Sequence, residues 1–371
     1  MNASLRLGLV GPLPPPPGGM ANQTRQLATL LGEQGVEVRV VRTNEPVRPA
    51  WVSSLRVVRG AFRLVPYLIR LGAVSRDCDV MHVMANSGWA WHLCAAPAIA
   101  IGAARGIPVV VNYRGGLARE FLRKSARSVL VTLRRAGAVV VPSRFLQEVF
   151  GEFGVHAEII PNIVNVDTFR PGPDARLGGA HVVVTRNLEH LYGIDVAIRA
   201  AGILAAEFPD LTLSIAGTGR ERASLERLVE RLGLGTVVRF TGALDVEAIA
   251  KLYRQADVML NPSRADNTPN AILEAAASAL PVVSTRVGGI PYLVEHGRSA
   301  WLVPTEDPQA MADGLRHVLR DAEVRSTLRE NGLTLARDCS WDTVRSQWLE
   351  LYWRVAQQRV ARRRTVLHVG K

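Results

Sequence analysis

The segment DVMLNPSRADNTPNAILEAAASALPVVST, residues 257–285, reads as one strand–loop–helix–strand unit. Its ends, DVML and PVVS, are short apolar runs of the kind that form buried strands. Thr268 suits the N-cap of a helix, and Pro269 suits the first helical position, where a backbone N–H is not needed. The segment therefore predicts a helix that begins at Pro269 and connects two parallel strands.

The same alternation of apolar runs and helical periodicity fills the chain. Continuous apolar runs indicate strands covered on both faces, hence parallel sheets with helices on each side. Strands are predicted at residues 6–11, 36–41, 79–83, 108–112, 138–141, 157–160, 181–185, 211–216, 237–240, 257–260, 281–284 and 300–303.

A proline-rich stretch without helical period, residues 161–173, separates these strands into two series. The fold class is therefore α/β, with two doubly wound, Rossmann-like domains that face each other across a cleft. We predict the first domain at residues 1–165 and the second at 166–340. Residues 341–371 are predicted as a C-terminal helix that packs back on the first domain and carries a basic tail.

Composition excludes several classes of protein. With 371 residues, 48% of them hydrophobic, the chain can bury the cores of two domains. Three widely spaced cysteines give neither a disulfide framework nor a metal-ligand pattern. The N-terminus lacks the layout of a secretory signal, and the longest apolar run, residues 89–104, is too short to span a bilayer. We expect a cytoplasmic protein in which that run forms a buried helix.

The net charge of +12 favours an anionic partner. Residues 56–70 and 121–135 read as helices that combine apolar residues with clustered cations, so they could lie on an anionic membrane surface; core helices with solvated arginines are the alternative. A nucleic-acid-binding protein is a rival interpretation, prompted by the basic tail at residues 359–364. No zinc module or helix-turn-helix supports it, so no nucleic acid is expected.

Ligands of such sheets bind beyond the carboxyl ends of the strands. The free N–H groups of the predicted helix, at Asn270 and Ala271, offer a seat for a phosphate. Glu274, about 1.5 turns inside, could accept hydrogen bonds from ribose hydroxyls. Asp266, before the cap, could reach the attached group. A carboxylate favoured by the helix dipole plus a turn aspartate is the alternative reading.

Several motifs occur in an order typical of one family. They are Gly11-Pro12 with Gly18-Gly19, VPSRFL at 141–146, IPN at 160–162, VDTF at 166–169, AGTG at 216–219, FTG at 240–242, PVVSTRVGG at 281–289 and WLVP at 301–304. With the acid pair, they make nearly the whole chain resemble glycosyltransferase family 4, the group 1 glycosyltransferases of GT-B fold.

The resemblance implies a retaining, hexosyltransferase-type enzyme that moves a sugar from a nucleotide diphosphate sugar to an acceptor hydroxyl. The acceptor would be a glycan, a lipid-linked molecule or a small molecule, in cell-envelope or polysaccharide biosynthesis. No metal and no other cofactor are expected, and the Asp-x-Asp at residues 77–79 leads into a strand instead of ending one. A nucleotide-sugar epimerase or phosphorylase of the same fold is the closest rival.

The resemblance also implies roles for single residues. Arg186 would neutralise the diphosphate, Asp266 would contact the sugar and Glu274 would hold the ribose. Glycines at 288 and 289 would allow close approach of the ligand, or would serve a tight turn. The predicted donor-binding residues are Gly18, Gly19, Arg186, Gly217, Asn267, Thr268, Asn270, Ala271 and Glu274. The predicted acceptor-side residues are Tyr113, Arg114 and Gly115, for which a structural turn with a solvated arginine is the alternative.

The chain departs from the family pattern at three places. Asp266 replaces the usual glutamate, so that Asn267 and Asn270 could share the sugar contact. Tyr192 stands where the family has a second phosphate-binding lysine; Arg264, Arg286 and Arg114 are candidates to replace its charge. The fourth strand ends in NYRGG, residues 112–116, where the family has a histidine. These losses leave an inactive relative as an alternative to an enzyme.

Overall fold

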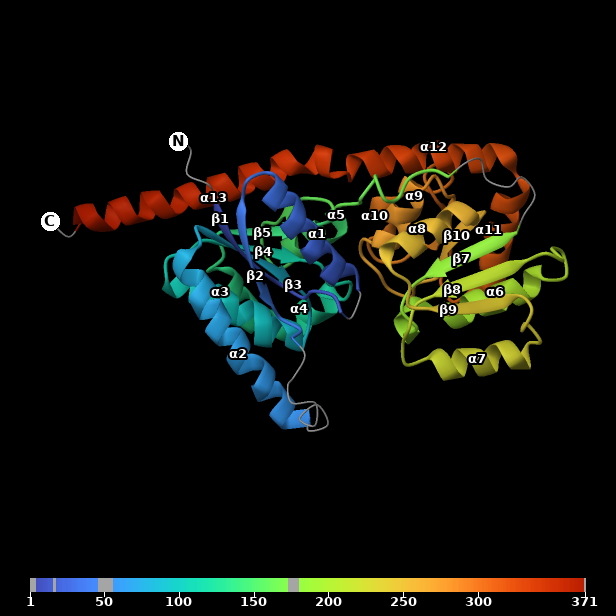
Figure 1. Ribbon diagram of the computed structural model, residues 1–371, viewed down its shortest axis with the longest axis horizontal. Coiled ribbons are helices and arrows are strands. Elements are labelled where there is room, and N and C mark those ends of the chain that lie inside the picture. Colours follow the sequence, from blue (N-terminus) through green and yellow to red (C-terminus); the bar gives the residue numbers. More distant parts are fainter. Residues whose placement is uncertain (1–4, 16–17, 46–55, 173–179, 370–371) are drawn as a thin grey trace. The chain divides into compact units, whose positions relative to one another are not determined.

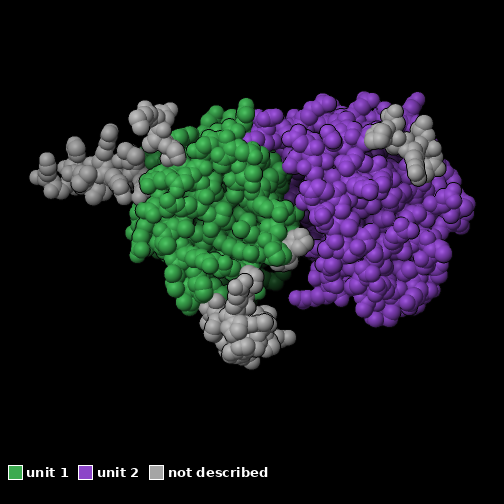
Figure 2. Space-filling model, viewed as in Figure 1, with its two compact units in different colours: residues 1–163, 344–371 green, residues 164–343 purple. Residues whose placement is uncertain are grey.

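The computed structural model describes residues 5–15, 18–45, 56–172 and 180–369 (Figure 1). The chain divides into two compact units (Figure 2). The first consists of Met1–Ile163 together with Val344–Lys371, and the second is Val164–Thr343. The first unit is therefore built from both ends of the chain.

Within the described part of the first unit, all strands are parallel and their order is β2-β1-β3-β4-β5-β6. The strands are β1 Arg6–Gly11, β2 Glu37–Arg42, β3 Val80–Ala85, β4 Val109–Tyr113, β5 Ala138–Val141 and β6 Glu158–Ile159. The helices are α1 Gly19–Glu33, α2 Arg56–Asp77, η2 Trp91–Ala95, α3 Ala96–Ala104, α4 Ala118–Leu133 and α5 Arg144–Gly151.

The described strands of the second unit are also parallel, but their order differs and is β12-β11-β10-β7-β8-β9. The strands are β7 His181–Thr185, β8 Thr212–Ala216, β9 Val238–Gly242, β10 Val258–Asn261, β11 Val282–Thr285 and β12 Trp301–Val303. The helices are η3 His190–Tyr192, α6 Ile194–Leu204, α7 Arg222–Arg231, α8 Val246–Gln255, α9 Asn270–Ala277, α10 Ile290–Leu293, α11 Pro308–Arg320 and α12 Ala322–Asp338. The last helix, α13 Trp341–Val369, starts at the end of this unit and lies mostly in the first.

These two sheets confirm the predicted fold class, two doubly wound α/β domains. Every predicted run contains a strand, with ends shifted by one or two residues at most. In both sheets, strand order reverses beside the first strand of the unit, and the buried core fills the space between sheet and helices. The loops that follow the central strands are thereby gathered at one edge of each sheet.

The run at residues 89–104 corrects one prediction. Residues 89–104 are helical throughout, with the π-helical stretch η2 continuing directly into α3, so the predicted helix is present but is only partly buried. Trp91 is buried, whereas Trp89 is 77% exposed and Leu93 is 41% exposed. The apolar composition of this run therefore does not match uniform burial, and part of it lies at the surface.

The C-terminal helix α13 belongs to the first unit from Val344 onward. The Tyr352 hydroxyl lies 2.7 Å from Nδ1 of His82 on β3, and the Trp348 and His82 rings are 5.1 Å apart. Along α13, the side chains of Val344, Trp348, Leu351, Tyr352 and Val355 are buried.

Candidate active site

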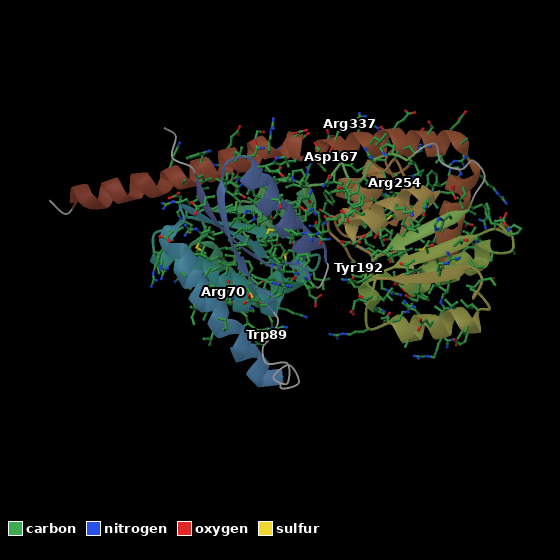
Figure 3. All side chains as sticks on the ribbon, in the orientation of Figure 1. Arg70, Trp89, Asp167, Tyr192, Arg254 and Arg337 are labelled. Carbon is green, nitrogen blue, oxygen red and sulfur yellow. The ribbon has the colours of Figure 1, made fainter. Side chains whose placement is uncertain are left out.

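Arg186 follows β7 directly and is the centre of a compact cluster. Its side chain is only 12% exposed and forms an ion pair with Asp266. Nη2 lies 3.2 Å from Oγ of Ser263, and Cζ lies 4.4 Å from the centre of the Tyr192 ring. These partners come from the loops after β7 and β10, so Arg186 lies at the carboxyl ends of the sheet, where Figure 3 labels Tyr192.

Glu274 lies in the first turns of α9, half-buried, on the same side as Arg186. The Tyr253 hydroxyl donates a hydrogen bond to its carboxylate and lies 2.5 Å from Oγ1 of Thr185. Burial raises the pKa of Glu274 to about 7, against the opposing influence of Arg186 and Tyr253. The carboxyl therefore changes charge close to neutral pH, and its geometry is set by a buried tyrosine.

Sequence reasoning missed Tyr253, Thr185 and Ser263. Tyr253 is 1% exposed on α8, and its position in an amphipathic helix resembles any core tyrosine. Ser263 and Thr185 follow or end strands, which was the available signal. The structure thus adds three hydroxyl groups, of Tyr253, Thr185 and Ser263, next to the predicted acids.

The start of α9 corrects a prediction. The helix begins at Asn270, with Pro269 as the N-cap residue in an extended conformation (φ −65°, ψ 118°) and no capping bond from a side chain. Because Pro269 is itself extended, the first helical residue is Asn270, and Thr268 lies one residue before the cap. The side chains of Asn267, Thr268 and Ala271 are buried.

The glycines near Arg186 and Asp266 serve the protein's own backbone. Gly217 has φ +152°, and a Cβ there would lie 2.1 Å from the Arg186 carbonyl oxygen. Gly288 has φ +53°, and its Cβ would lie 2.0 Å from the Asp266 carbonyl oxygen. Gly289 approaches the Asn267 carbonyl in the same way. The predicted close approach to a ligand is thus a close approach between loops.

Arg264, one candidate for the missing cation, is committed elsewhere. Its guanidinium makes two 2.9 Å hydrogen bonds to Asp195 and a further ion pair with Glu306. The hydrogen bonds to Asp195 raise the pKa of Arg264. Arg264 also donates to the His190 carbonyl, at 2.7 Å, and so fixes the turn that carries Tyr192. It is a structural residue, whereas Arg286, directly after β11, is exposed.

In the first unit, Tyr113 corrects the acceptor-side prediction. It is fully buried at the end of β4, its ring packs 5.0 Å from that of Phe150, and its hydroxyl donates to Oγ of Ser87 at 3.2 Å. A Cβ on Gly115 would lie 2.5 Å from Oδ1 of Asn86. Tyr113 is therefore a core residue, and Gly115 is a glycine because neighbouring side chains leave no room.

Arg114 is not the solvated arginine of the alternative reading. Nη1 donates to Oδ1 of Asn162 at 2.6 Å and to Oε1 of Gln23 at 3.2 Å. Burial lowers the pKa of Arg114 to about 10. Gly18 precedes α1 in extended conformation, with open space where a Cβ would lie, and Gly19 is the first residue of that helix.

The structure therefore brings together Arg186, Asp266 and Glu274, with Asn270 at the start of the same helix as Glu274. The predicted site residues that lie in the first unit are Gly18, Gly19, Tyr113, Arg114 and Gly115. Among the described residues, no group of histidine, cysteine and acidic side chains could hold a metal ion.

Comparisons with known proteins identify the family. Residues 17–168 match the family described as Glycosyltransferase Family 4, and residues 179–321 match Glycosyl transferases group 1. The chain belongs to this glycosyltransferase family. The chain is 37% identical to a D-inositol 3-phosphate glycosyltransferase of Corynebacterium urealyticum over 172 residues. This aligned segment covers 44% of this chain and 41% of that relative. The match thus spans less than half of the relative's length.

Two further comparisons cover more of the family 4 chain. A phosphatidyl-myo-inositol mannosyltransferase of Mycobacterium leprae is 27% identical over 95% of this chain and 97% of its own length. The solved structure of HepE from Anabaena, in complex with UDP and glucose, has a TM-score of 0.72 and 20% identity, over 94% of this chain and 99% of that one. The latter comparison shows that the fold is shared.

Proposed function

We propose that this chain transfers a sugar from a nucleotide diphosphate sugar to an acceptor hydroxyl. The observation that carries the proposal is the Arg186 cluster. A guanidinium, an aspartate and a titratable glutamate meet at the carboxyl ends of a parallel sheet, beside the start of α9. The UDP and glucose bound to HepE support a nucleotide-sugar donor.

Each group has a role in this proposal. Arg186 stabilises the negative charge that grows on the diphosphate as the bond to the sugar breaks, which lowers the barrier more than it tightens ground-state binding. Glu274, as a carboxylate, accepts hydrogen bonds from the ribose hydroxyls. Asp266 contacts the sugar once phosphate oxygens replace it on Arg186.

The stereochemistry that we propose is retention. The acceptor oxygen attacks from the face that the diphosphate leaves, forms the new bond to the anomeric carbon, and gives its proton to the departing phosphate oxygen. Arg186 and the N–H groups at the start of α9 supply positive charge at the leaving group, so we propose that no metal takes part.

A panel of UDP-, GDP- and ADP-sugars tests the activity, with sugar transfer and donor hydrolysis as readouts. We expect Arg186→Ala and Glu274→Ala each to reduce turnover by about 10²-fold or more. Arg199→Ala and Glu247→Ala, at exposed positions on α6 and α8, are matched controls. Wild-type rates in either site variant would refute the assignment, and product formed without an acceptor would indicate an epimerase or phosphorylase.

We further propose a lipid-linked acceptor at the inner face of the plasma membrane, in cell-envelope or polysaccharide biosynthesis. On the first unit, Val65 and Ile69 of α2 are 55% and 67% exposed, and Trp89 is 77% exposed. Helix α2 packs against α3, and α3 packs against α4, where Val131 is 52% exposed. Figure 3 labels Trp89 and the exposed Arg70 in this unit.

Apolar side chains beside exposed arginines fit an anionic membrane surface. No helix within the described ranges could span a bilayer. The predicted segment at 56–70 is helical, but the side chains of residues 56–62 lie outside the described ones. Co-sedimentation with phosphatidylglycerol vesicles at low salt tests the proposal, with Ile69→Ser and Trp89→Ser expected to weaken binding. Absence of wild-type binding would end it.

A further inference from the structure

The Arg186 guanidinium depends on an aromatic face for much of its support. Its Cζ lies 4.4 Å from the centre of the Tyr192 ring. Its Nε is buried and has no hydrogen-bond partner among the described residues. Burial lowers the pKa of Arg186. The ring therefore stabilises a cation that has lost much of its contact with water.

The turn that carries Tyr192 is fixed from two sides. Gly193 closes it with φ +60°, and a Cβ there would lie 2.2 Å from the Pro262 carbonyl oxygen. Arg264 donates to the carbonyl of His190 and is held by two hydrogen bonds to Asp195. The ring also packs against the core of the second unit. Tyr192 cannot leave Arg186 without breaking these contacts.

The opposite condition holds for the anionic partner of Arg186. Asp266 is on a loop, and Oδ2, the oxygen that pairs with Arg186, also accepts a hydrogen bond from Ser263 at 3.2 Å. Oδ1 accepts a hydrogen bond from the Asn267 N–H at 2.9 Å, so the Oδ1 contact does not depend on Arg186. A diphosphate can then replace one anion by another on the same guanidinium. During this exchange, the stacked ring is the contact that stays.

We propose that Tyr192 is a positioning residue, which holds the plane of the Arg186 guanidinium while Asp266 is exchanged for the diphosphate of the donor. This inference rests on the proposed function. Tyr192 then orients the Arg186 guanidinium and contributes no charge of its own. The loop after β7 binds the diphosphate with one cation, Arg186, where the family resemblance led us to expect two.

The test compares three substitutions: Tyr192→Phe, which keeps the ring; Tyr192→Leu, which removes it; and Tyr192→Lys, which adds a charge. UDP, GDP and ADP are the probes in binding titrations. For the nucleoside diphosphate that binds, kcat and KM are then measured with the corresponding nucleotide sugar. A cation–π contact of this burial corresponds to about 3- to 30-fold in affinity.

We expect Tyr192→Phe to bind the nucleoside diphosphate within about 2-fold of wild type, and Tyr192→Leu to bind it about 3- to 30-fold more weakly. The matching nucleoside, which lacks phosphates, should bind both variants equally. Tyr192→Lys should make diphosphate binding more sensitive to salt, since a second cation then meets the phosphates. If thermal melting shows that Tyr192→Leu does not fold, Tyr192→Met takes its place in the test.

The outcomes separate two failures. If the wild type binds none of the three diphosphates, the proposed function itself is wrong. If the wild type binds one, and a folded Tyr192→Leu or Tyr192→Met binds it equally well, only the positioning role is refuted. A Tyr192→Phe variant as weak as the leucine variant would also refute it, because the hydroxyl and not the ring would then matter.

Discussion

Two arginines directly follow parallel strands of the two sheets, and their surroundings differ. Arg114, after β4, donates to two neutral side-chain amides, and its neighbour Tyr113 is fully buried. Arg186, after β7, pairs with a carboxylate and stacks on a ring. Neutral partners leave a cation nothing to exchange, whereas an anionic partner can be replaced by an anionic ligand. This difference favours Arg186 over Arg114 as the arginine that meets the diphosphate in the proposed reaction.

The surroundings of Arg114 support this assignment. Gln23 uses both ends of its amide on Ile163, donating to its carbonyl at 2.6 Å and accepting from its N–H at 3.0 Å. Burial lowers the pKa of nearby His82 to about 3, so that the ring stays neutral. These contacts are made within the first unit, although Nε of Arg114 has no hydrogen-bond partner among the described residues.

The largest effect should come from replacing each of the two arginines by alanine. Arg114→Ala leaves buried acceptors on Gln23 and Asn162, so we expect the free energy of unfolding to fall by about 2–3 kcal/mol, with nucleotide binding retained. Arg186→Ala should abolish nucleotide binding, and it should also lower stability, because the Asp266 carboxylate loses its partner. Denaturant unfolding and nucleotide titration of both variants measure this, with exposed Arg127→Ala as control. Nucleotide binding retained in Arg186→Ala, or lost in a folded Arg114→Ala, would contradict the assignment.

The second effect concerns pH, because only the Arg186 cluster contains an acid that titrates near neutrality. The pKa of Glu274 is about 7 in the folded chain and lower in the unfolded chain, so the native state binds more protons in between. The stability that protonated Glu274 provides is therefore full below about pH 4.5 and lost as pH rises through 7. The loss is about 1.4 kcal/mol for each unit by which the pKa is raised.

Glu274→Gln removes this titration, so wild type should lose stability relative to the variant between about pH 5 and 7.5. Binding of a nucleotide sugar should show the opposite trend in the wild type and strengthen as the carboxylate forms. Thermal unfolding and donor titration across this range measure both. Parallel stability curves for wild type and Glu274→Gln would contradict the raised pKa.

The smallest effect should come from Asp266→Asn, which keeps the shape of the side chain and removes the anion that competes with phosphate. We expect nucleoside diphosphates to bind the variant about 3- to 10-fold more tightly, while sugar transfer falls. Titration with the diphosphate and a turnover assay separate the two effects. Weaker diphosphate binding would mean that Asp266 supports the phosphate site instead of competing for it.

The sequence predicted the fold well because both of its signals are local. Continuous apolar runs located every strand, and the proline-rich stretch at 161–173 contains the boundary between the two units. Burial of α13 followed from its helical spacing. The run at 89–104 failed because hydrophobicity alone does not distinguish a buried side chain from an exposed one such as Trp89.

The candidate site was predicted less completely. Arg186, Asp266 and Glu274 could be named from their positions after strands and in a helix start, and their grouping follows from the parallel sheet. Their mutual contacts could not, because the pairing of Arg186 with Asp266 joins residues 80 positions apart. Tyr253 carried no local signal.

The return of α13 to the first unit has a consequence for synthesis on the ribosome. The second unit is continuous in sequence, whereas the first lacks Trp348 and Tyr352 until the last part of the chain has been translated. His82 then lacks the Tyr352 hydroxyl at Nδ1 and the Trp348 ring, and retains its contact with the Asn112 amide. We therefore expect the second unit to complete its core before the first unit does. Chaperone contacts on nascent chains should then concentrate on the sheet of the first unit.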